Sequence, residues 1–343
     1  MNHKTHVSIR GEKFYINDEL TYKGRYWNGH RVEGLLFNSR MVQATFDDLN
    51  DETRHRWDFP DGSKWDPDRN TSEFLAQMPT YRDHGLLAIT VNLQGGSPYG
   101  YSDIDEQIWT NSAINPDGSL RAEYMARMEK VIDKADELGM VIILGIFYFG
   151  QEKVLQDQDA FGIAVDNVMD WLFEHAYRNV IIEVNNECNI IYKQPVMLPE
   201  NIHKLIERVA ADERDGYRYL VGTSYGGNHV PRANVVQASD FILMHGNSVK
   251  HPARIAEMVR QVRQVEGYRT MPILFNEDDH FDFDKPTNNM LAALSEYASW
   301  GFFDYRMEGE GFDDGYQSVP VNWGLSSDRK RGFFTLLKDI TGI

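Results

Sequence analysis

Two glutamates stand at the ends of short apolar segments, where they could take part in acid-base or nucleophilic chemistry. Residues 180–187 read VIIEVNNE and residues 272–277 read PILFNE, so each segment ends in Asn-Glu. Such β-branched runs are typical of buried parallel strands, whose last residues reach the rim of a sheet. Two carboxyl groups delivered in this way suit hydrolysis of a glycosidic bond. One donates a proton to the leaving oxygen, and the other, ionised, attacks or stabilises the sugar carbon.

The rest of the chain alternates between strand and helix patterns, which predicts one α/β domain. Eight strands that alternate with helices predict a (β/α)8 TIM barrel over residues 41–343. Within it, Asn70 to Glu73 predicts a capped helix start, and Gly139 predicts a left-handed helix end. Residues 225–239 are rich in Gly, Pro and Asn and predict a loop or short turn. The predicted strands are 41–46, 86–93, 140–147, 180–186, 219–223, 241–245, 272–276 and 301–306, and a last helix covers 328–340.

The N-terminal residues follow a different pattern. Residues 7–29 alternate weakly and carry turn pairs at Arg10-Gly11 and Asn17-Asp18, which favours a hairpin. We expect residues 1–40 to form a hairpin extension that packs on the barrel and closes one of its ends. A structural plug is the favoured role for this extension, ahead of a binding role.

Composition narrows the possible partners. The chain has 343 residues with 35 Lys+Arg and 52 Asp+Glu, a formal net charge of −17, and no run of five basic residues. This balance disfavours nucleic acid and anionic membranes as partners.

The single cysteine, Cys188, excludes an intramolecular disulfide. Residues 1–10 lack the apolar region of a signal peptide, and the apolar run at 140–149 is too short to span a bilayer. We expect a soluble protein, cytoplasmic as the sequence stands, or secreted or periplasmic if a signal peptide has been removed. The sequence does not predict an oligomeric state.

Polar residues collect at the carboxyl ends of the predicted strands, where barrel active sites lie. Because side chains alternate along a strand, we expect Glu183, Asn185 and Glu187 to share one face, and Phe275 and Glu277 to share another. The fourth and seventh strands lie across the ring, so the two terminal carboxyl groups should face each other. A separation of about 5–5.5 Å would permit covalent attack with retention, and a wider one would admit water and predict inversion. The other strand-end and loop residues expected to contact a substrate are Asp47, Asn92, Gln94, Tyr148, His245, Glu308 and Trp323.

Four tryptophans fall in predicted loops on the reactive side, where flat rings could stack on the apolar faces of sugars. For any one of them, ordinary packing is the commoner role. Trp171 and Trp300 sit in helical patterns and are expected in the core. The four loop tryptophans are Trp57, Trp65, Trp109 and Trp323.

Asn186-Glu187 on the fourth strand, His245 on the sixth and Glu277 on the seventh resemble the large clan of (β/α)8 retaining glycoside hydrolases that includes many cellulases, mannanases and β-galactosidases. The resemblance covers residues 41–340 in element order. It implies that Glu187 is the acid/base and Glu277 the nucleophile. Asn186 would bind the sugar hydroxyl next to the reacting carbon, and His245 would steady the nucleophile or a hydroxyl. The resemblance also implies that the sugars are β-linked. We expect a neutral carbohydrate substrate and no metal or organic cofactor.

The chain departs from the clan at two places. Cys188 follows the acid, where many members have Pro. Members also often place an Arg beside the nucleophile from an early strand end, whereas Arg40 precedes the first predicted strand. The mechanism requires Glu187 to stay protonated near neutrality and Glu277 to stay ionised, which demands hydrogen-bond donors around Glu277. His245 is the leading candidate for such a donor.

Two other functions fit the strand-end residues less well. Asp47, Glu187, His245 and Glu277 could chelate Mg²⁺ or Mn²⁺ in a metal-dependent isomerase or lyase. However, no His-x-His pair follows the first strand, and no Lys ends a strand to act as a base. A non-catalytic sugar-binding barrel is the third possibility. It is disfavoured because burying two glutamates together is costly without a purpose.

Overall fold

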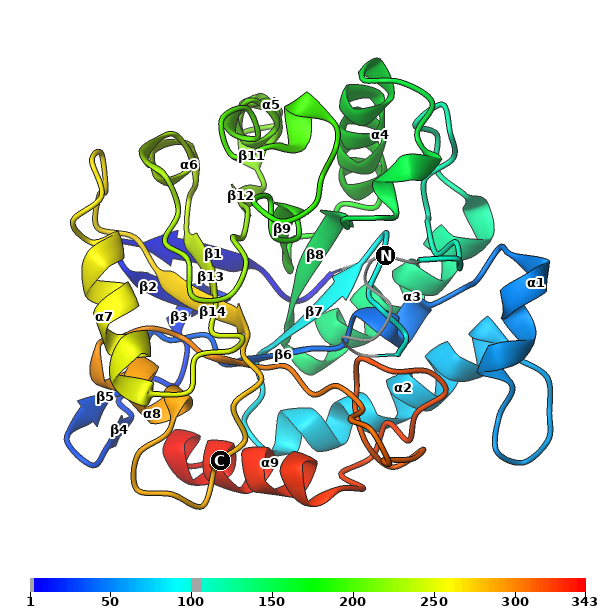
Figure 1. Cartoon of the computed structure of the whole chain (residues 1–343). Helices are drawn as coiled ribbons and strands as arrows, with labels where there is room; N and C mark the ends of the chain where they lie inside the picture. Colours follow the sequence, from blue (N-terminus) through cyan, green and yellow to red (C-terminus); the bar gives the residue numbers. More distant parts are fainter. Residues whose placement is uncertain (1–2, 100–106) are drawn as a thin grey trace.

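Eight parallel strands surround a common axis, with helices on the outside, which confirms the predicted (β/α)8 barrel (Figure 1). The computed structural model describes residues 3–99 and 107–343. Six strands form one sheet in the order β12-β9-β8-β7-β6-β15, and β13 pairs with β14. Parallel bridges from Leu274 to Ser299 and from Asp278 to Phe302 join β14 to the β15 side of the ring. The barrel strands are β6 (Asn38–Arg40), β7 (Ala88–Asn92), β8 (Val141–Phe147), β9 (Val180–Asn185), β12 (Leu220–Gly222), β13 (Ile242–His245), β14 (Ile273–Glu277) and β15 (Gly301–Phe302).

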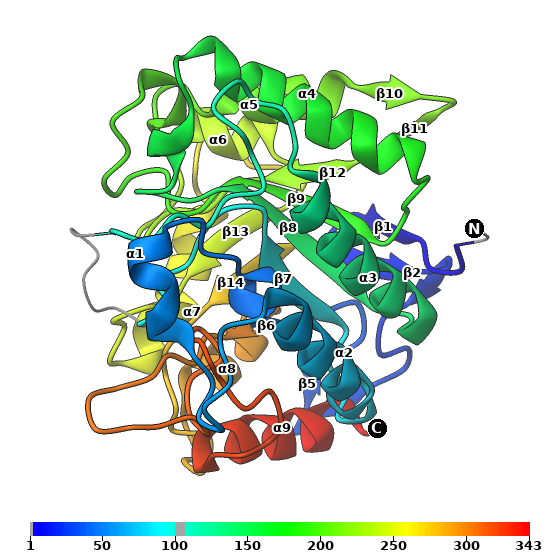
Figure 2. The same ribbon diagram turned by 90° about the vertical axis from the view of Figure 1, so that its right-hand side faces the viewer.

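The helices lie outside the strands, and α2, α3 and α4 cover the β6 to β9 side (Figure 2). In α3, apolar residues at helical spacing, including Tyr124, Met128 and Val131, are buried against the strands. Gly139 ends α3 in the left-handed conformation, as predicted. The helices are α1 (Asp51–Arg54), α2 (Pro67–Asp83), α3 (Ala122–Leu138), α4 (Asp159–Glu174), α5 (His203–Ala211), α6 (Ala233–Ala238), α7 (Pro252–Val262), α8 (Asn289–Ser295) and α9 (Asp328–Thr341). Short 3₁₀ turns cover η1 (Val42–Thr45), η2 (His55–Trp57), η4 (Glu152–Val154) and η5 (Pro195–Met197).

The first barrel strand differs from the prediction. It is Asn38–Arg40, and the expected strand at 41–46 is largely the 3₁₀ turn Val42–Thr45. Asn38 pairs with Ala88, and Arg40 pairs with Thr90. All three residues of β6 are polar and buried, so a search for apolar runs passes over them. Arg40 therefore stands at the carboxyl end of a barrel strand and not below it.

Two other predicted element boundaries differ from the structure. Helix α2 begins at Pro67, because Asp66 caps it by accepting hydrogen bonds from the backbone N–H groups of Asp68 and Arg69. The start predicted at Asn70 lies inside this helix. Strand β15 covers two residues, where 301–306 was predicted. The short helix α6 agrees with the short turn predicted between 225 and 239.

Hairpins precede the first barrel strand and pack on the barrel, and residues 38–40, which were predicted to belong to the N-terminal extension, form that strand. The extension forms an antiparallel sheet of β1 (Val7–Arg10), β2 (Lys13–Ile16) and β3 (Glu19–Leu20), followed by a hairpin of β4 (Tyr26–Trp27) and β5 (His30–Arg31). Asn17 and Asp18 both have positive φ, which suits the tight turn between β2 and β3. Val7 and Phe14 are buried in one apolar cluster with Ile143 of β8 and Leu243 of β13. The sheet thus closes one end of the barrel interior.

The remaining apolar residues form a large cluster between strands and helices and a small cluster under the loops. Trp300 belongs to the large cluster and Trp171 packs against it, as predicted. A two-stranded hairpin of β10 (Glu213–Arg214) and β11 (Tyr217–Arg218) follows α5. Within 3–99 and 107–343, the helices are too short or too polar to cross a lipid bilayer.

Candidate active site

Glu187 and Glu277 meet at the carboxyl ends of β9 and β14. The Nδ1 atom of His245 lies 2.9 Å from Glu187 Oε1 and 3.6 Å from Glu277 Oε2. One oxygen of each carboxyl group and a ring nitrogen of His245 all lie within 4.8 Å of one another. Glu187 is 9% exposed and Glu277 is 4% exposed, so both carboxyl groups interact in a largely dry environment. Three of the predicted site residues are therefore brought together.

Arg40 lies beneath these groups and links three elements. Its Nε atom lies 2.7 Å from Glu277 Oε2, and its Nη2 atom donates a hydrogen bond to Asn186 Oδ1 at 2.9 Å. Its Nη1 atom lies 3.6 Å from Glu183 Oε2. Sequence reasoning missed Arg40 because the first strand was placed too late in the chain. The Arg that the resemblance asks for at an early strand end was the signal that could have corrected the boundary.

Two asparagines also contact the buried carboxylates. The Asn247 amide donates to Glu277 Oε1, and the Asn276 amide donates to Glu183 Oε2 at 3.2 Å. The backbone N–H of Gly246 donates to the carbonyl of Glu277 at 2.7 Å, which holds the loop after β13 against the end of β14. Neither asparagine was predicted as a site residue, since nothing in the residue pattern separates them from other strand-end amides.

The regular alternation of side chains breaks at both strand ends. Glu183 and Asn186 both approach Arg40, although residues three apart lie on opposite faces of a regular strand. Asn185 turns away, and its amide donates to the carbonyl of Met197. The expectation that Asn185 shares a face with Glu183 and Glu187 is therefore wrong. A register shift next to His245 similarly lets it pair with Glu277.

Glu187 has a strained backbone. Its φ of 53° lies in the left-handed region, which residues with a Cβ rarely adopt. The backbone N–H of Glu187 donates to Ser224 Oγ at 2.9 Å, and that of Cys188 donates to the carbonyl of Ser224 at 3.0 Å. Such strain persists only where neighbouring contacts hold it, and it is common at functional sites.

The charges in this cluster shift one another. Burial alone would lower the pKa of His245, but the carboxylates of Glu277, Glu187 and Glu183 outweigh it and raise that pKa. Burial raises the pKa of Glu277, while the positive charges of Arg40 and His245 oppose the rise.

Tyr148 and Asn92 lie beside this cluster. Burial raises the pKa of Tyr148, and the charge on Glu277 raises it further, which places its hydroxyl within electrostatic reach of the carboxylates. Asn92 packs against the backbone of Gly145, the residue that pairs with Glu183. Both amide atoms of Asn92 are buried without a hydrogen-bond partner among the described residues. A substrate-binding role for these two residues stays a prediction.

Two of the predicted binding residues are tied into the loops. The carboxylate of Asp47 lies 2.7 Å from Arg127 and 3.1 Å from Arg121. Gln94 donates to Ser112 Oγ and to the carbonyl of Gln151. These contacts fix the positions of the loops. A substrate-binding role for Asp47 or Gln94 stays a prediction.

Trp323 is held by packing and a hydrogen bond, and Glu308 faces solvent. The indole N–H of Trp323 donates to Asn70 Oδ1, and its ring stacks on Tyr316. Glu308 is exposed. All four loop tryptophans are buried, with Trp57, Trp65 and Trp109 in the small loop cluster, so packing accounts for their rings.

Among residues 3–99 and 107–343, the side chains grouped closely enough to hold a metal ion are Glu187, His245 and Glu277. Their ligand atoms are close enough, but Arg40 already occupies the Glu277 oxygen with a positive charge. Asp47, the fourth ligand of the metal alternative, is neutralised by two arginines. The donor set therefore fits a divalent cation poorly.

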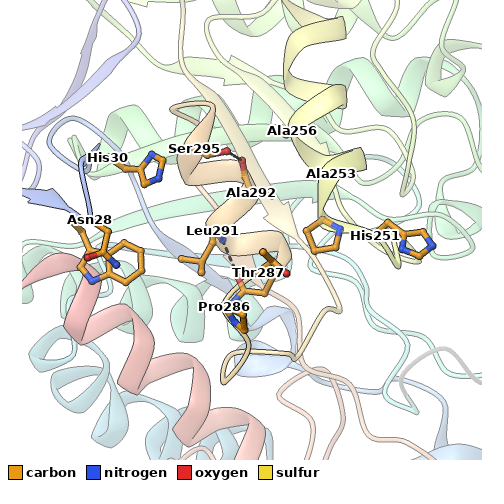
Figure 3. A pocket seen from close by; sticks show the side chains of 13 residues that line it. Asn28, His30, His251, Ala253, Ala256, Pro286, Thr287, Leu291, Ala292 and Ser295 are labelled. Carbon is orange, nitrogen blue, oxygen red and sulfur yellow. Dashed lines mark hydrogen bonds between the residues drawn. The ribbon is translucent and has the colours of Figure 1, made fainter.

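A surface groove of about 690 Å³ lies away from the glutamate pair, between the β4–β5 hairpin, α7 and α8. Figure 3 shows Asn28 and His30 on the hairpin side and His251 on the opposite side. The groove is lined by Trp27, Asn28, His30, His251, Pro252, Ala253, Ala256, Pro286, Thr287, Asn288, Leu291, Ala292 and Ser295. Its lining includes neither Glu187 nor Glu277.

The fold and the buried carboxyl pair define a (β/α)8 barrel protein with a strand-end acidic site. No protein-family model and no curated protein sequence matches this chain. Among solved structures, it is similar to a family 5 glycoside hydrolase from Bacteroides vulgatus, with 13% identity, a TM-score of 0.59, and coverage of 97% of this chain and 70% of that one. A candidate glycoside hydrolase from the same organism matches with 13% identity, a TM-score of 0.54, and coverage of 93% of this chain and 59% of that one. This chain therefore spans less than two thirds of that protein's length.

A third solved structure is a β-glucanase from Saccharophagus degradans in complex with cellotetraose. The identity is 12%, the TM-score is 0.52, and the match covers 98% of this chain and 94% of that one. At these identities the likeness shows the fold alone. The chain has the (β/α)8 barrel fold of glycoside hydrolases.

Proposed function

We propose that the protein is a glycoside hydrolase that cleaves β-linked sugars with retention, with Glu187 as acid/base and Glu277 as nucleophile. The observation that carries the proposal is the closeness of the two carboxyl groups, since one oxygen of Glu187 lies within 4.8 Å of one oxygen of Glu277. Retaining enzymes hold their carboxyl groups about 5–5.5 Å apart, whereas inverting enzymes leave about 6.5–9.5 Å for a water. The spacing supports direct attack.

The contacts of Glu277 support its proposed role as the nucleophile. Glu277 receives a guanidinium and an amide donor, and both favour its ionised form. A proton on Glu187 and a negative charge on Glu277 are the starting state that the reaction needs.

The reaction would proceed in two displacements. A Glu277 oxygen bonds to the anomeric carbon, while Glu187 donates its proton to the leaving oxygen and the glycosidic bond breaks. Glu187, now ionised, then takes a proton from water. The resulting hydroxide oxygen attacks the anomeric carbon and releases Glu277. Two inversions at one carbon give net retention.

Asn186 is suited to bind the sugar during these steps. Arg40 holds its Oδ1 atom, so the side chain cannot rotate freely. Its Nδ2 atom is buried and has no hydrogen-bond partner among the described residues. A buried donor without a partner is costly, and a sugar hydroxyl would satisfy it. This supports the hydroxyl-binding role inferred from the resemblance.

A neutral, β-linked saccharide is the substrate class that we propose. The net charge of −17 disfavours polyanionic sugars and nucleic acid. One of the solved structures with this fold is a β-glucanase in complex with cellotetraose, which supports testing β-glucans first.

The decisive experiment is a screen of aryl β-glycosides and β-linked polysaccharides with Glu187→Gln and Glu277→Gln. Glu207→Gln on α5, an exposed position, is the matched control. Glu277→Gln should lower kcat/KM on every substrate by at least about a thousandfold. Glu187→Gln should lose about 10²–10⁴-fold on polysaccharides and much less in the first step on aryl glycosides, whose leaving groups need little protonation.

The stereochemistry of the first-formed product, followed by NMR, tests retention directly. A product with inverted configuration would overturn the double-displacement mechanism but would still support glycosidase activity. Full activity in Glu277→Gln would overturn the assignment. Activity that chelator abolishes and Mg²⁺ or Mn²⁺ restores would instead favour the metal-dependent alternative.

A further inference from the structure

Asp278, the residue after Glu277, is a buried carboxylate that the proposed mechanism does not use. It is 0% exposed. It accepts hydrogen bonds from Trp300 Nε1 at 2.8 Å, from the Asn289 amide at 3.0 Å and from the backbone N–H of His280 at 3.1 Å. Burial raises the pKa of Asp278 to about 8 despite these donors. Burying an acidic group is costly, so its position requires a reason beyond packing.

The Asp278 carboxylate lies against the backbone of Gly246. A Cβ atom placed on Gly246 would lie 2.0 Å from Asp278 Oδ2, so only a glycine leaves room for the carboxylate. Gly246 stands between His245, which hydrogen-bonds Glu187, and Asn247, which hydrogen-bonds Glu277. A shift of the carboxylate would therefore move both partners of the glutamate pair.

Further contacts tie the same two segments together. The backbone N–H of Ser248 donates to Asp279 Oδ1 at 3.0 Å. The Asn289 amide, which donates to Asp278, also donates to the carbonyl of Val249 at 3.1 Å. The loop from His245 to Val249 thus rests on the segment that follows the proposed nucleophile.

From these contacts we propose that Asp278 is a positioning residue, which sets where His245 and Asn247 lie against Glu187 and Glu277. The inference rests on the proposed function, because it assigns Asp278 a part in that reaction. Asp278 acts through the Gly246 backbone and does not touch substrate. Hydrogen-bond donors hold both of its oxygens in place. In Asp278→Asn, an amide N–H₂ replaces one oxygen and points at the donor of Trp300 or Asn289, so two donors repel each other.

The test compares Asp278→Asn with Asp48→Asn. Asp48 is also completely buried, and it accepts hydrogen bonds from Trp57 Nε1 at 2.8 Å and from the backbone of Thr110 at 2.9 Å. It belongs to the loop after η1, and its other hydrogen-bond partners include Thr53 of α1. The two variants should lose similar hydrogen bonds, but only one lies against Gly246.

Kinetics and ¹⁵N NMR of the His245 ring provide the readouts. Asp278→Asn should lower kcat by about tenfold to a hundredfold, the loss expected of a small misplacement, with KM within about twofold. Its His245 should release its proton at lower pH than in the wild type, because the contacts with Glu187 and Glu277 weaken. Asp48→Asn, corrected for folded fraction, should keep both properties.

Wild-type kcat and an unshifted His245 titration in Asp278→Asn would overturn the proposal, as would equal changes in Asp48→Asn. Should Asp278→Asn not fold, Gly246→Ala, Asp278→Ala and the double variant replace it. If Asp278 acts through its contact with Gly246, the double variant should lose no more kcat than the more impaired single variant. A fold-loss in the double variant equal to the product of the two single fold-losses would refute the proposal. The His245 titration needs no glycosidase activity, so a failure of the proposed function, seen as active Glu277→Gln, is distinguishable from a failure of this inference.

Discussion

The Nε atom of Arg40 lies 2.7 Å from Glu277 Oε2, so the first barrel strand supplies the charge that faces the proposed nucleophile on the seventh. Both side chains are almost completely buried. The guanidinium also reaches Asn186 and Glu183, and a planar fork of donors suits such a bridge. Burial raises the pKa of Glu277, so ionisation of the nucleophile depends on this contact.

Arg40→Lys should therefore separate charge from geometry. A lysine keeps the positive charge but cannot bridge three acceptors, so we expect kcat/KM to fall by about a hundredfold with a modest loss of stability. Arg40→Met should also cost about 3–5 kcal/mol of unfolding free energy, because it leaves buried carboxylates unpaired. Steady-state kinetics and urea unfolding check both variants. The control is Arg218→Lys, which alters the ion pair between Arg218 and Asp240. An equal loss of kcat/KM in this control would contradict the prediction.

His245 should make stability depend on pH with a definite sign. Its pKa is raised in the folded protein, so its stabilisation is fully present below about pH 6.5, the ordinary value, and is lost as pH rises through the raised pKa. The difference in unfolding free energy between wild type and His245→Gln should therefore shrink from about pH 6 to pH 9. Urea unfolding across this range measures it, and a difference that grows with pH would refute the raised pKa.

Glu183 should matter for stability through Arg40 and Asn276. Glu183→Ala removes a buried counter-charge and leaves the Asn276 amide without its acceptor, so we expect a loss of about 3–5 kcal/mol. Glu183→Gln keeps an acceptor and should lose less. It should also lower the pH at which His245 titrates, because Glu183 helps to raise that pKa. Thermal unfolding and ring NMR give the two readouts, and an unchanged His245 titration would count against this electrostatic link.

Trp323 offers a direct choice between packing and binding. Its buried ring stacks on Tyr316, so Trp323→Ala should cost about 3–5 kcal/mol of stability and leave KM within about twofold below the unfolding temperature. Calorimetry and saturation kinetics on the same preparation decide between the two. A large rise in KM with little change in stability would support the substrate-binding role predicted from the sequence.

The parts of the fold that the sequence predicts well are those with a clear apolar period. β8 and β9 are apolar, β-branched-rich runs, and α3 carries a regular apolar face that ends at Gly139, so both strands and the end of the helix were placed within a few residues. The apolar pattern does not predict β6, because its residues Asn38, Ser39 and Arg40 are polar. They are buried by hydrogen bonds and ion pairs rather than by apolar contacts. Its position depends on partners far along the chain.

The candidate site divides in the same way. Glu187, Glu277 and His245 were found because they end recognisable strands. Arg40, Asn247 and Asn276 were missed because their importance lies in which carboxylate each one reaches. The departure from regular pleating at Asn185 could not be read from residue types, since it is set by contacts with Met197 and Thr223.

That departure also determines how much chemistry one strand can present. A regular pleat offers every second side chain to the barrel mouth, yet here the neighbours Asn186 and Glu187, and likewise Asn276 and Glu277, all join the same charged cluster. The rim therefore carries adjacent rather than alternate polar groups. A one-residue deletion at either point would restore a plain zigzag and dismantle the cluster, while the barrel around it kept its hydrogen-bonded frame.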